Sequence, residues 1–374
     1  MLRFLTAGES HGPALVAILE GLPAGVSIDV RALQGEMRRR QLGYGRGPRM
    51  QLETDTVELL SGIRRGKTLG SPIAVTIKNA DASIDRLPVV THPRPGHADL
   101  AGAVKYDHRD IRNVLERASA RETAARVAVG ALCRAVLSRL GIELASHVIA
   151  LGSVRARPST VSVARLRARA EASPLRCLDP QASRRMMRQI DACVKAGDTL
   201  GGVFEVVIEG VPPGLGSHVH YDRRLDAILG RAILSIHAVK AVEIGEGVAA
   251  ASLRGSRVQD EIFYTKAKGF ARSSNRAGGF EGGMTTGQPI VVRGFLKPLS
   301  TLRTPLRSVD IRTKRPVLAT VERSDVTTVP AAGVVGEAMI AFELARAVLE
   351  KFGGDSLREL KRNYDSYLRQ VEQF

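Results

Sequence analysis

The stretch Gly8-Glu9-Ser10-His11-Gly12 lies between two short apolar runs, at residues 2–5 and 15–19. Each run has the length of a β-strand, and glycines beside a histidine let the backbone turn tightly and approach a ligand. A histidine side chain titrates near neutral pH, so His11 is suited to proton transfer. We therefore predict a strand, a tight loop whose side chains face a site, and a second strand.

The same stretch also matches the G-x-S-x-G nucleophile elbow of serine hydrolases, with Ser10 as the nucleophile. That elbow requires a helix directly after the serine. Pro13 and the apolar run that ends at Gly21-Leu22-Pro23 favour a strand instead. The pentapeptide alone leaves open a serine hydrolase that uses Ser10 and a buried histidine with a purely structural role.

The composition indicates a globular protein that attracts anions. The chain has 374 residues, of which 44% are hydrophobic, and a formal net charge of +17. Nucleic acid, an acidic surface or a polyanionic small substrate would each suit this charge. Aromatic residues make up only 4% and tryptophan is absent, which disfavours a protein that stacks single-stranded bases.

The three cysteines form no C-x-x-C pair, so we expect neither a disulfide framework nor a zinc site, and a cytoplasmic location. No signal peptide is recognisable at the start, where Met1 leads directly into strand-like sequence. The most apolar late stretch, residues 326–349, contains Glu337, Glu343 and Arg346. These charges predict a core helix rather than a membrane span.

Two arginine-bearing segments predict anion sites. Asp29 can cap a helix over residues 30–41, which leads into a glycine-rich loop, residues 43–49, that carries Arg46 and Arg49. Guanidinium groups on a glycine-rich loop suit a lid over phosphate or carboxylate, although arginines at a helix C-terminus also simply favour its dipole.

The second segment is the start of a long helix that ends near Leu140. Ser119 and Glu122 form an S-x-x-E capping box, and Arg117 and Arg121 flank the helix N-terminus. Backbone N–H groups and the helix dipole already favour anions there, so an anion site is expected beyond the ordinary role of a capped core helix.

Four later stretches contribute further candidates. The rigid loop at residues 94–99 holds His97, and the glycine cluster at residues 275–284 allows close approach to a flat or phosphorylated ligand, without the spacing of a Rossmann motif. Residues 297–301 place a cation and two hydroxyls in a turn that could grip phosphate. Asp325, next to Arg323, is expected to stay ionised and to act as a base.

Other segments carry less chemistry. Strands are predicted at residues 56–60, 73–77, 203–208, 241–244 and 290–295, and a helix at residues 222–236. His218 and His220 would share one strand face, but no third metal ligand is evident, so packing or surface is the better interpretation. Strands and helices do not alternate strictly, which favours an α+β fold.

Residues 152–194 are rich in arginine, and a charge-rich run is usually a solvated face. We therefore expect an exposed, partly helical excursion. Its arginines are Arg155, Arg157, Arg165, Arg167, Arg169, Arg184, Arg185 and Arg188.

Taken together and in order, several of these stretches resemble the motifs of the chorismate synthase family. They are residues 8–12, 40–49, 94–99, 117–122, 275–284, 297–301 and 323–325. The resemblance covers nearly the whole chain. It implies one α+β domain over residues 1–374, with helices between antiparallel sheets, and assembly as a homotetramer.

The resemblance also implies a reaction. The family converts 5-enolpyruvylshikimate 3-phosphate to chorismate and phosphate by an anti-1,4-elimination, the last common step of the shikimate pathway to the aromatic amino acids. Reduced FMN is required although no net redox change occurs. An external source such as a separate flavin reductase is expected, with NADPH as the indirect reductant, and no nucleic-acid or membrane partner. The alternatives are a basic nucleic-acid-binding protein and the serine hydrolase.

The family's functional residues carry over onto matching positions. His11 would protonate the departing phosphate, His97 would protonate or steady the reduced flavin, and Asp325 would help the flavin take the ring proton. The expected substrate contacts are Ser10, Arg40, Arg46, Arg94, Ser119, Arg121 and Arg323. The expected FMN contacts are Arg117, Ala118, Ser119, His237, Ala238, Gly282, Lys297, Pro298, Leu299, Ser300, Thr301 and Arg323. Arg40 and Arg46 are the expected NADP contacts, and no metal ligand is expected.

Overall fold

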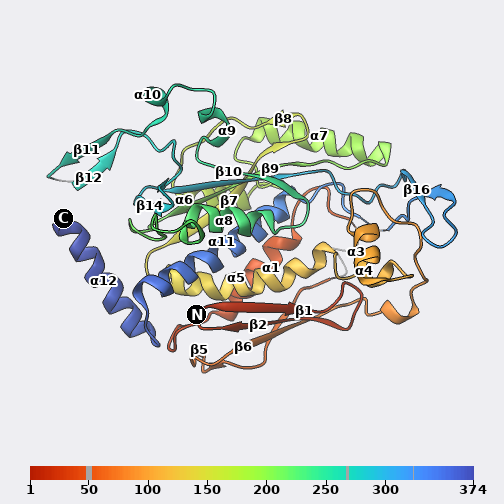
Figure 1. The fold of residues 1–374 in the computed structure, drawn as a ribbon, viewed down its shortest axis with the longest axis horizontal. Coiled ribbons are helices and arrows are strands. Elements are labelled where there is room, and N and C mark those ends of the chain that lie inside the picture. Colours follow the sequence, from red (N-terminus) through yellow and green to blue (C-terminus); the bar gives the residue numbers. More distant parts are fainter. Residues whose placement is uncertain (48–52, 267–268, 323) are drawn as a thin grey trace.

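Two antiparallel sheets enclose a layer of helices (Figure 1). The computed structural model describes residues 1–47, 53–266, 269–322 and 324–374. Helix α5 (Thr123–Ser138) packs on the first sheet, and helix α11 (Val329–Phe352) packs on the second. The predicted α+β fold, with helices between antiparallel sheets, is confirmed.

The first sheet begins with the strand–turn–strand unit that the sequence predicts. Its order is β1 (Arg3–Ala7), β2 (Ala14–Glu20), β6 (Ile73–Lys78) and β3 (Val57–Leu59), and every pair is antiparallel. Gly8 has a φ of +101°, and a Cβ there would lie 2.2 Å from the Ala14 carbonyl oxygen, so this turn requires glycine. A strand follows Ser10 where the nucleophile elbow of a hydrolase needs a helix.

The second sheet has the order β10 (Val239–Ile244), β15 (Ile290–Leu296), β9 (Gly202–Glu209), β7 (Glu143–Leu151) and β8 (Val154–Arg155). It is covered on both faces, which explains why nearly all of β7 is buried. One face packs on α11, and the other packs on α6 (Val163–Glu171).

Helices α5 and α11 approach each other unusually closely. At Gly130 a Cβ would lie 2.3 Å from the Cβ of Ala338, so only glycine fits at this crossing. Helices α1 (Val30–Gln41) and α8 (Leu225–Leu234) complete the layer against α11.

A buried ionic network lies inside this helical layer. Glu337 of α11 forms ion pairs with Arg39 at 2.7 Å, Arg134 at 2.8 Å and Arg176 at 3.3 Å. Burial alone would raise the pKa of the Glu337 carboxyl, but the three guanidinium groups lower it well below its usual range. These four residues are called the Glu337 cluster below.

The predicted helix starts are borne out in part. Asp29 caps α1, since its carboxylate accepts hydrogen bonds from the backbone N–H groups of Arg31 and Ala32. The helix after Ser119 opens instead with the 3-10 turn η2 (Ala120–Glu122), because the Ser119 hydroxyl accepts from the Arg121 N–H. Glu122 turns away to Thr6 and Arg126, so the reciprocal half of the capping box is not formed.

Residues 152–194 are more deeply integrated than an exposed excursion. They form β8, α6 and α7 (Pro180–Ala196), and Met186 and Ile190 of α7 are buried in the main core. Seven of the eight arginines named above are exposed, as a solvated face requires, and Arg167 is half-buried against Glu36. A helix that is amphipathic at i, i+4 spacing explains both observations.

The segment with His218 and His220 is an exposed loop rather than a strand, so the predicted shared strand face is wrong. The remaining described elements are short apart from the C-terminal helix. They are β4 (Ile63–Arg64), β5 (Lys67–Thr68), η1 (Ile84–Arg86), α3 (Asp99–Tyr106), α4 (Arg112–Leu115), η3 (Tyr221–Arg223), α9 (Gly247–Ala250), α10 (Gly255–Val258), β11 (Ile262–Thr265), β12 (Gly269–Arg272), β13 (Phe280–Glu281), β14 (Met284–Thr285), β16 (Arg307–Val309), β17 (Pro316–Leu318) and α12 (Leu357–Gln373).

Candidate active site

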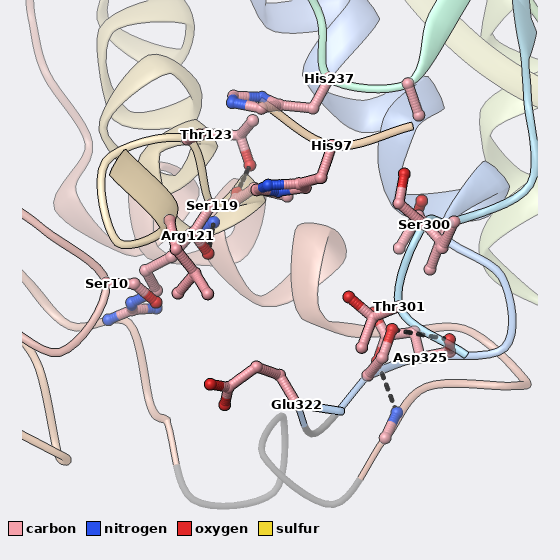
Figure 2. A pocket seen from close by; sticks show the side chains of 18 of the residues that line it. Ser10, His97, Ser119, Arg121, Thr123, His237, Ser300, Thr301, Glu322 and Asp325 are labelled. Atoms are coloured by element: carbon pink, nitrogen blue, oxygen red, sulfur yellow. Dashed lines mark hydrogen bonds between the residues drawn. The ribbon is translucent and has the colours of Figure 1, made fainter. Parts of the chain in front are cut away.

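A cavity of about 520 Å³ lies where several loops meet the N-terminal ends of α5 and α11. Figure 2 shows Ser10 and Arg121 on one side of it, Ser300, Thr301 and Asp325 on the other, and His97 and His237 between them. Most predicted site residues line this cavity. They are Ser10, His11, Arg40, Arg46, Arg94, His97, Ala118, Ser119, Arg121, His237, Ala238, Lys297, Leu299, Ser300, Thr301 and Asp325.

Three predicted residues are placed differently, and a fourth is not described. Arg117 points away from the cavity and donates hydrogen bonds to the backbone oxygens of Thr6 and Gly8. Gly282 lies in the turn between β13 and β14, and Pro298 does not face the cavity although both of its neighbours do. Arg323, like Arg49 of the glycine-rich loop, lies outside the described residues.

His11 is held from behind by a buried carboxylate. Its Nδ1 lies 2.6 Å from Oε2 of Glu116, which also accepts the His11 backbone N–H at 3.1 Å. Arg112 donates to the other oxygen of Glu116 at 3.0 Å. Burial would raise the pKa of the Glu116 carboxyl, but His11 and Arg112 lower it below its ordinary value.

His97 has a similar partner in Asp99. Its Nδ1 lies 2.6 Å from Oδ1 of Asp99, whose other oxygen accepts hydrogen bonds from the backbone N–H and Nε of Arg94. Burial opposes ionisation of Asp99, but His97 and Arg94 outweigh it and lower the pKa of this carboxyl well below its usual range. Nη2 of Arg94 also lies 3.0 Å from the same ring nitrogen, so Nδ1 of His97 faces both an acceptor, Asp99, and a donor, Arg94.

Two buried arginines meet at Asp55 on the floor of the site. Arg40 and Arg121 each donate to a separate oxygen of Asp55, and Arg121 also donates to Glu53 at 3.2 Å. Burial would raise the pKa of Asp55, but both guanidinium groups lower it. The Nε of Arg40 is buried without a hydrogen-bond partner among the described residues, so one donor remains for a ligand.

Residues 45–47 of the glycine-rich loop contact the segment that carries Asp325. Arg46 forms an ion pair with Asp325 at 2.9 Å, and the backbone N–H of Gly47 donates to the same carboxylate at 2.5 Å. A hydrogen bond from the Val326 N–H to the Gly45 oxygen adds to this contact. Arg46 therefore supplies a cation beside Asp325.

The turn at residues 297–301 is tied to the His97 loop. Lys297 donates from Nζ to the Gly96 oxygen and to the Ser300 hydroxyl, both at 2.8 Å, and Thr301 accepts from Arg94 at 2.8 Å. Burial, with a smaller effect from Lys240, lowers the pKa of Lys297. The cation and the two hydroxyls predicted as a phosphate grip thus face the cavity together.

His237 lines the cavity as a neutral ring. Burial is the largest cause that lowers the pKa of its imidazole, and it outweighs the nearby Glu122 carboxylate. Its Nδ1 is buried and has no hydrogen-bond partner in the part of the chain that the structure describes. A buried polar atom of this kind is costly unless a ligand satisfies it.

Several site residues were missed by sequence reasoning. Glu116, Asp81 and Glu322 were not considered, and Asp99 and Asp55 were given no role. Asp99 follows His97 at i+2 in a quoted motif, and Glu116 follows Arg112 at i+4 and directly precedes Arg117. These carboxylates are recognisable only when their contacts across the chain are known.

Comparison with known proteins identifies the family. The family model for chorismate synthase matches residues 2–349. The chain belongs to the chorismate synthase family. It is 56% identical over 388 residues to the chorismate synthase of Symbiobacterium thermophilum, with 99% of each chain covered, and 53% identical over 390 residues to that of Geobacillus kaustophilus, with 100% of each covered.

A solved structure titled "Crystal Structure of Chorismate Synthase" matches with a TM-score of 0.82 at 44% identity. The match covers 100% of this chain and 99% of the other. Nothing in these comparisons supports the serine hydrolase or the nucleic-acid-binding alternative. None of the described helices is long and apolar enough to cross a membrane, and within the same residues no group of three His, Cys, Asp or Glu side chains could hold a metal ion.

Proposed function

We propose that this cavity carries out the reaction of the chorismate synthase family, the elimination of phosphate from 5-enolpyruvylshikimate 3-phosphate to form chorismate. The activity is that of a carbon–oxygen lyase in the shikimate pathway. The observation that carries the proposal is the meeting of two carboxylate-held histidines with buried arginines in one cavity, in a chain that belongs to this family.

The arginines suit the substrate, which carries one phosphate and two carboxylates. A guanidinium group has five N–H donors, so Arg40 and Arg121 can hold Asp55 and a ligand anion together. Arg94 and Arg46 add two further guanidinium groups at the cavity wall, with Ser10 and Ser119 as hydroxyl partners. Because Asp55 already fixes two of the arginines, little side-chain freedom is lost when substrate binds.

His11 supplies the proton for the departing phosphate. Its Nδ1 faces Glu116, so Nε2 is the ring atom that remains for the leaving oxygen. General acid catalysis by a positioned histidine is worth about 10²–10⁴ in rate. Asp325, held by Arg46 and the Gly47 N–H, is the base proposed to help remove the ring proton.

The cavity also fits reduced FMN. Nδ1 of His237, which has no hydrogen-bond partner among the described residues, could bind a ligand atom. Lys297, Ser300 and Thr301 offer a cation and two hydroxyls for a phosphate. A volume of about 520 Å³ lies within the range of about 300–1,000 Å³ that is typical of cofactor and ligand pockets. Bound reduced FMN supplies electron density to the breaking C–O bond without net redox change. His97, oriented by Asp99, would steady the anionic cofactor.

Further properties are proposed from family membership. Reduced flavin would come from an external reductase with NADPH as indirect reductant, for which Arg40 and Arg46 are the proposed NADP contacts. The protein would work in the cytoplasm as a homotetramer. Light scattering of the purified protein would test the tetrameric assembly directly.

The proposed activity is tested anaerobically with 5-enolpyruvylshikimate 3-phosphate and dithionite-reduced FMN. Phosphate release and chorismate absorbance are followed together, with oxidised FMN as the control. We expect equal amounts of both products, and neither without reduced flavin. Folded, flavin-binding protein that yields no product would contradict the proposal.

A further inference from the structure

Glu116 lies behind the cavity rather than in its wall, yet it binds both the backbone and the ring of His11. Its Oε2 meets both the backbone N–H and Nδ1 of His11, at 3.1 and 2.6 Å. Its Oε1 accepts from Arg112 at 3.0 Å, and none of its side chain is exposed. Arg112 is in turn fixed by the Pro88 oxygen at 2.9 Å and by Glu322 at 3.4 Å.

These contacts determine which ring nitrogen carries hydrogen. His11 and Arg112 lower the pKa of the Glu116 carboxyl, and an ionised carboxylate only accepts hydrogen bonds, so Nδ1 of His11, at 2.6 Å, is the donor. The other nitrogen, Nε2, lies 3.9 Å from the carboxylate of Asp81, which is beyond hydrogen-bond distance. Nε2 is therefore left for a ligand in the cavity.

We propose that Glu116 is a positioning residue, which accepts Nδ1–H of His11 in the interior and directs Nε2 toward the leaving phosphate, so that the imidazolium form transfers its Nε2 proton to the phosphate and becomes the neutral ring with hydrogen on Nδ1. This inference rests on the proposed role of His11 as the proton donor. Glu116 does not line the cavity, so it acts on the reaction only through the imidazole.

The variant Glu116→Gln removes the charge but keeps the size of the side chain. A neutral amide can either accept or donate, so it no longer selects one form of the ring. Loss of the orienting carboxylate in a catalytic triad costs up to about 10⁴ in kcat. Here we expect kcat to fall about 10- to 100-fold, with KM for the substrate changed by less than about twofold.

The chain offers a matched control on the second sheet. Glu205 likewise lies between an imidazole and a guanidinium group, 2.9 Å from Nε2 of His147 and 2.7 Å from Nε of Arg293, with 12% of its side chain exposed, and it lies outside the cavity. Glu205→Gln therefore reproduces the structural cost of removing a largely buried charge. We expect a comparable loss of thermal stability with kcat close to that of the unaltered protein.

A double-variant cycle tests whether Glu116 acts only through His11 or also has a catalytic role that is independent of His11. In a His11→Ala background, Glu116→Gln should lower kcat no further, because its effect passes through the absent ring. A full additional loss in that background, or an unchanged kcat in a folded Glu116→Gln protein, would overturn the proposal.

The ring itself can be examined in the unaltered protein with ¹⁵N-labelled histidine, its His11 signals assigned by comparison with His11→Ala. We expect the neutral ring to carry its hydrogen on Nδ1, and hydrogen on Nε2 alone would overturn the inference even if Glu116→Gln failed to fold. An unaltered protein without turnover would instead contradict the proposed function, while the NMR result would still decide the ring orientation.

Discussion

His97 and His11 are held by the same arrangement of residues. Each Nδ1 faces a buried carboxylate, and each carboxylate is also bound by an arginine, Arg94 in one case and Arg112 in the other. Both rings are thus fixed before any ligand arrives. Such preorganisation lowers the reorganisation that the reaction would otherwise require.

His237 provides a prediction about flavin binding. His237→Phe keeps a flat ring but removes the buried nitrogen that lacks a partner, so the hydrogen bond to the ligand is lost. A hydrogen bond contributes about 0.5–1.5 kcal/mol, and we expect the Kd for reduced FMN to rise about 3- to 10-fold. Anaerobic flavin titration measures this change. His218→Phe, at an exposed histidine outside the cavity, should leave the Kd unchanged; equal losses in both variants would contradict the assignment.

Most of the residues that line the cavity could be predicted from sequence, but their supporting residues could not. His11, His97 and Lys297 lie in short stretches rich in glycine, proline and hydroxyl side chains, where function constrains several neighbours at once. Glu116 lies 105 residues from His11 along the chain, and its role exists only through that contact. No local sequence pattern indicates a contact between two residues that are so far apart in the chain.

Helix crossing in the central layer depends on small residues. The α5–α11 contact passes through Gly130, and Gly333 and Gly336 of α11 lie against Ser146 and Phe204 of the second sheet. The absence of side chains at these points brings α11 close to both of its neighbours. The position of α11 also sets the cavity, since Ala331 and Ala332 in its first turn line it.

Gly130→Val is expected to destabilise the fold. The new Cβ would lie 2.3 Å from the Cβ of Ala338 and 2.4 Å from its Cα, so the helix backbone must move. Overpacking of this kind costs about 1–3 kcal/mol, which calorimetry would record as a lower Tm. In the control Gly230→Ala, the added Cβ of α8 meets nothing within 4 Å, and a gain of about 0.4–1 kcal/mol is expected. An unchanged Tm for Gly130→Val would show that the helices separate freely.

Helices and strands with a clear hydrophobic periodicity were predicted well. Elements whose structure depends on tertiary contacts were not. Residues 30–41 and the main strands follow from local patterns. Helix α12 was not predicted although Ser356 caps it in an S-x-x-E pattern, and only Leu360 and Tyr364 of this helix are buried. The burial of residues 152–194 was underestimated because the many arginines of this segment made the apolar face of α7 difficult to recognise in the sequence.

The molecule has a net positive charge, and inside it many carboxylates are paired with arginine or histidine side chains. Among the described residues, twelve carboxyl groups have a pKa below the ordinary value. In eight of them, burial is the largest single effect, and neighbouring arginine or histidine side chains provide most of the effect that outweighs it. These eight are Glu36, Asp55, Asp99, Glu116, Glu122, Glu171, Glu205 and Glu337. In each case the folded state favours the ionised form more than the unfolded chain does.

Stability is therefore expected to fall in acid. Below about pH 4.5 the unfolded chain binds protons that the folded carboxylates do not, so their contribution is present above that pH and lost as the pH falls. His237 acts in the same direction below about pH 6.5, because its folded pKa is also lowered. Glu343, whose pKa is raised, opposes the trend as a single group.

Urea unfolding at pH 7 and pH 4 would measure this dependence. We expect a lower midpoint at pH 4, and a smaller difference between the two midpoints in Glu205→Gln, which removes one of the eight groups. A midpoint that stays constant or rises toward pH 4 would contradict this account of the interior.

The Glu337 cluster restricts the order in which this sequence can evolve. Loss of one arginine leaves Glu337 with two cationic partners, whereas loss of Glu337 removes the carboxylate that all three arginines share. Breaking a buried ion pair costs about 3–5 kcal/mol, while an entirely apolar replacement is often neutral. The four positions are thus epistatic, and a lineage that exchanges this interior for an apolar one is expected to lose the first of its arginines before its glutamate.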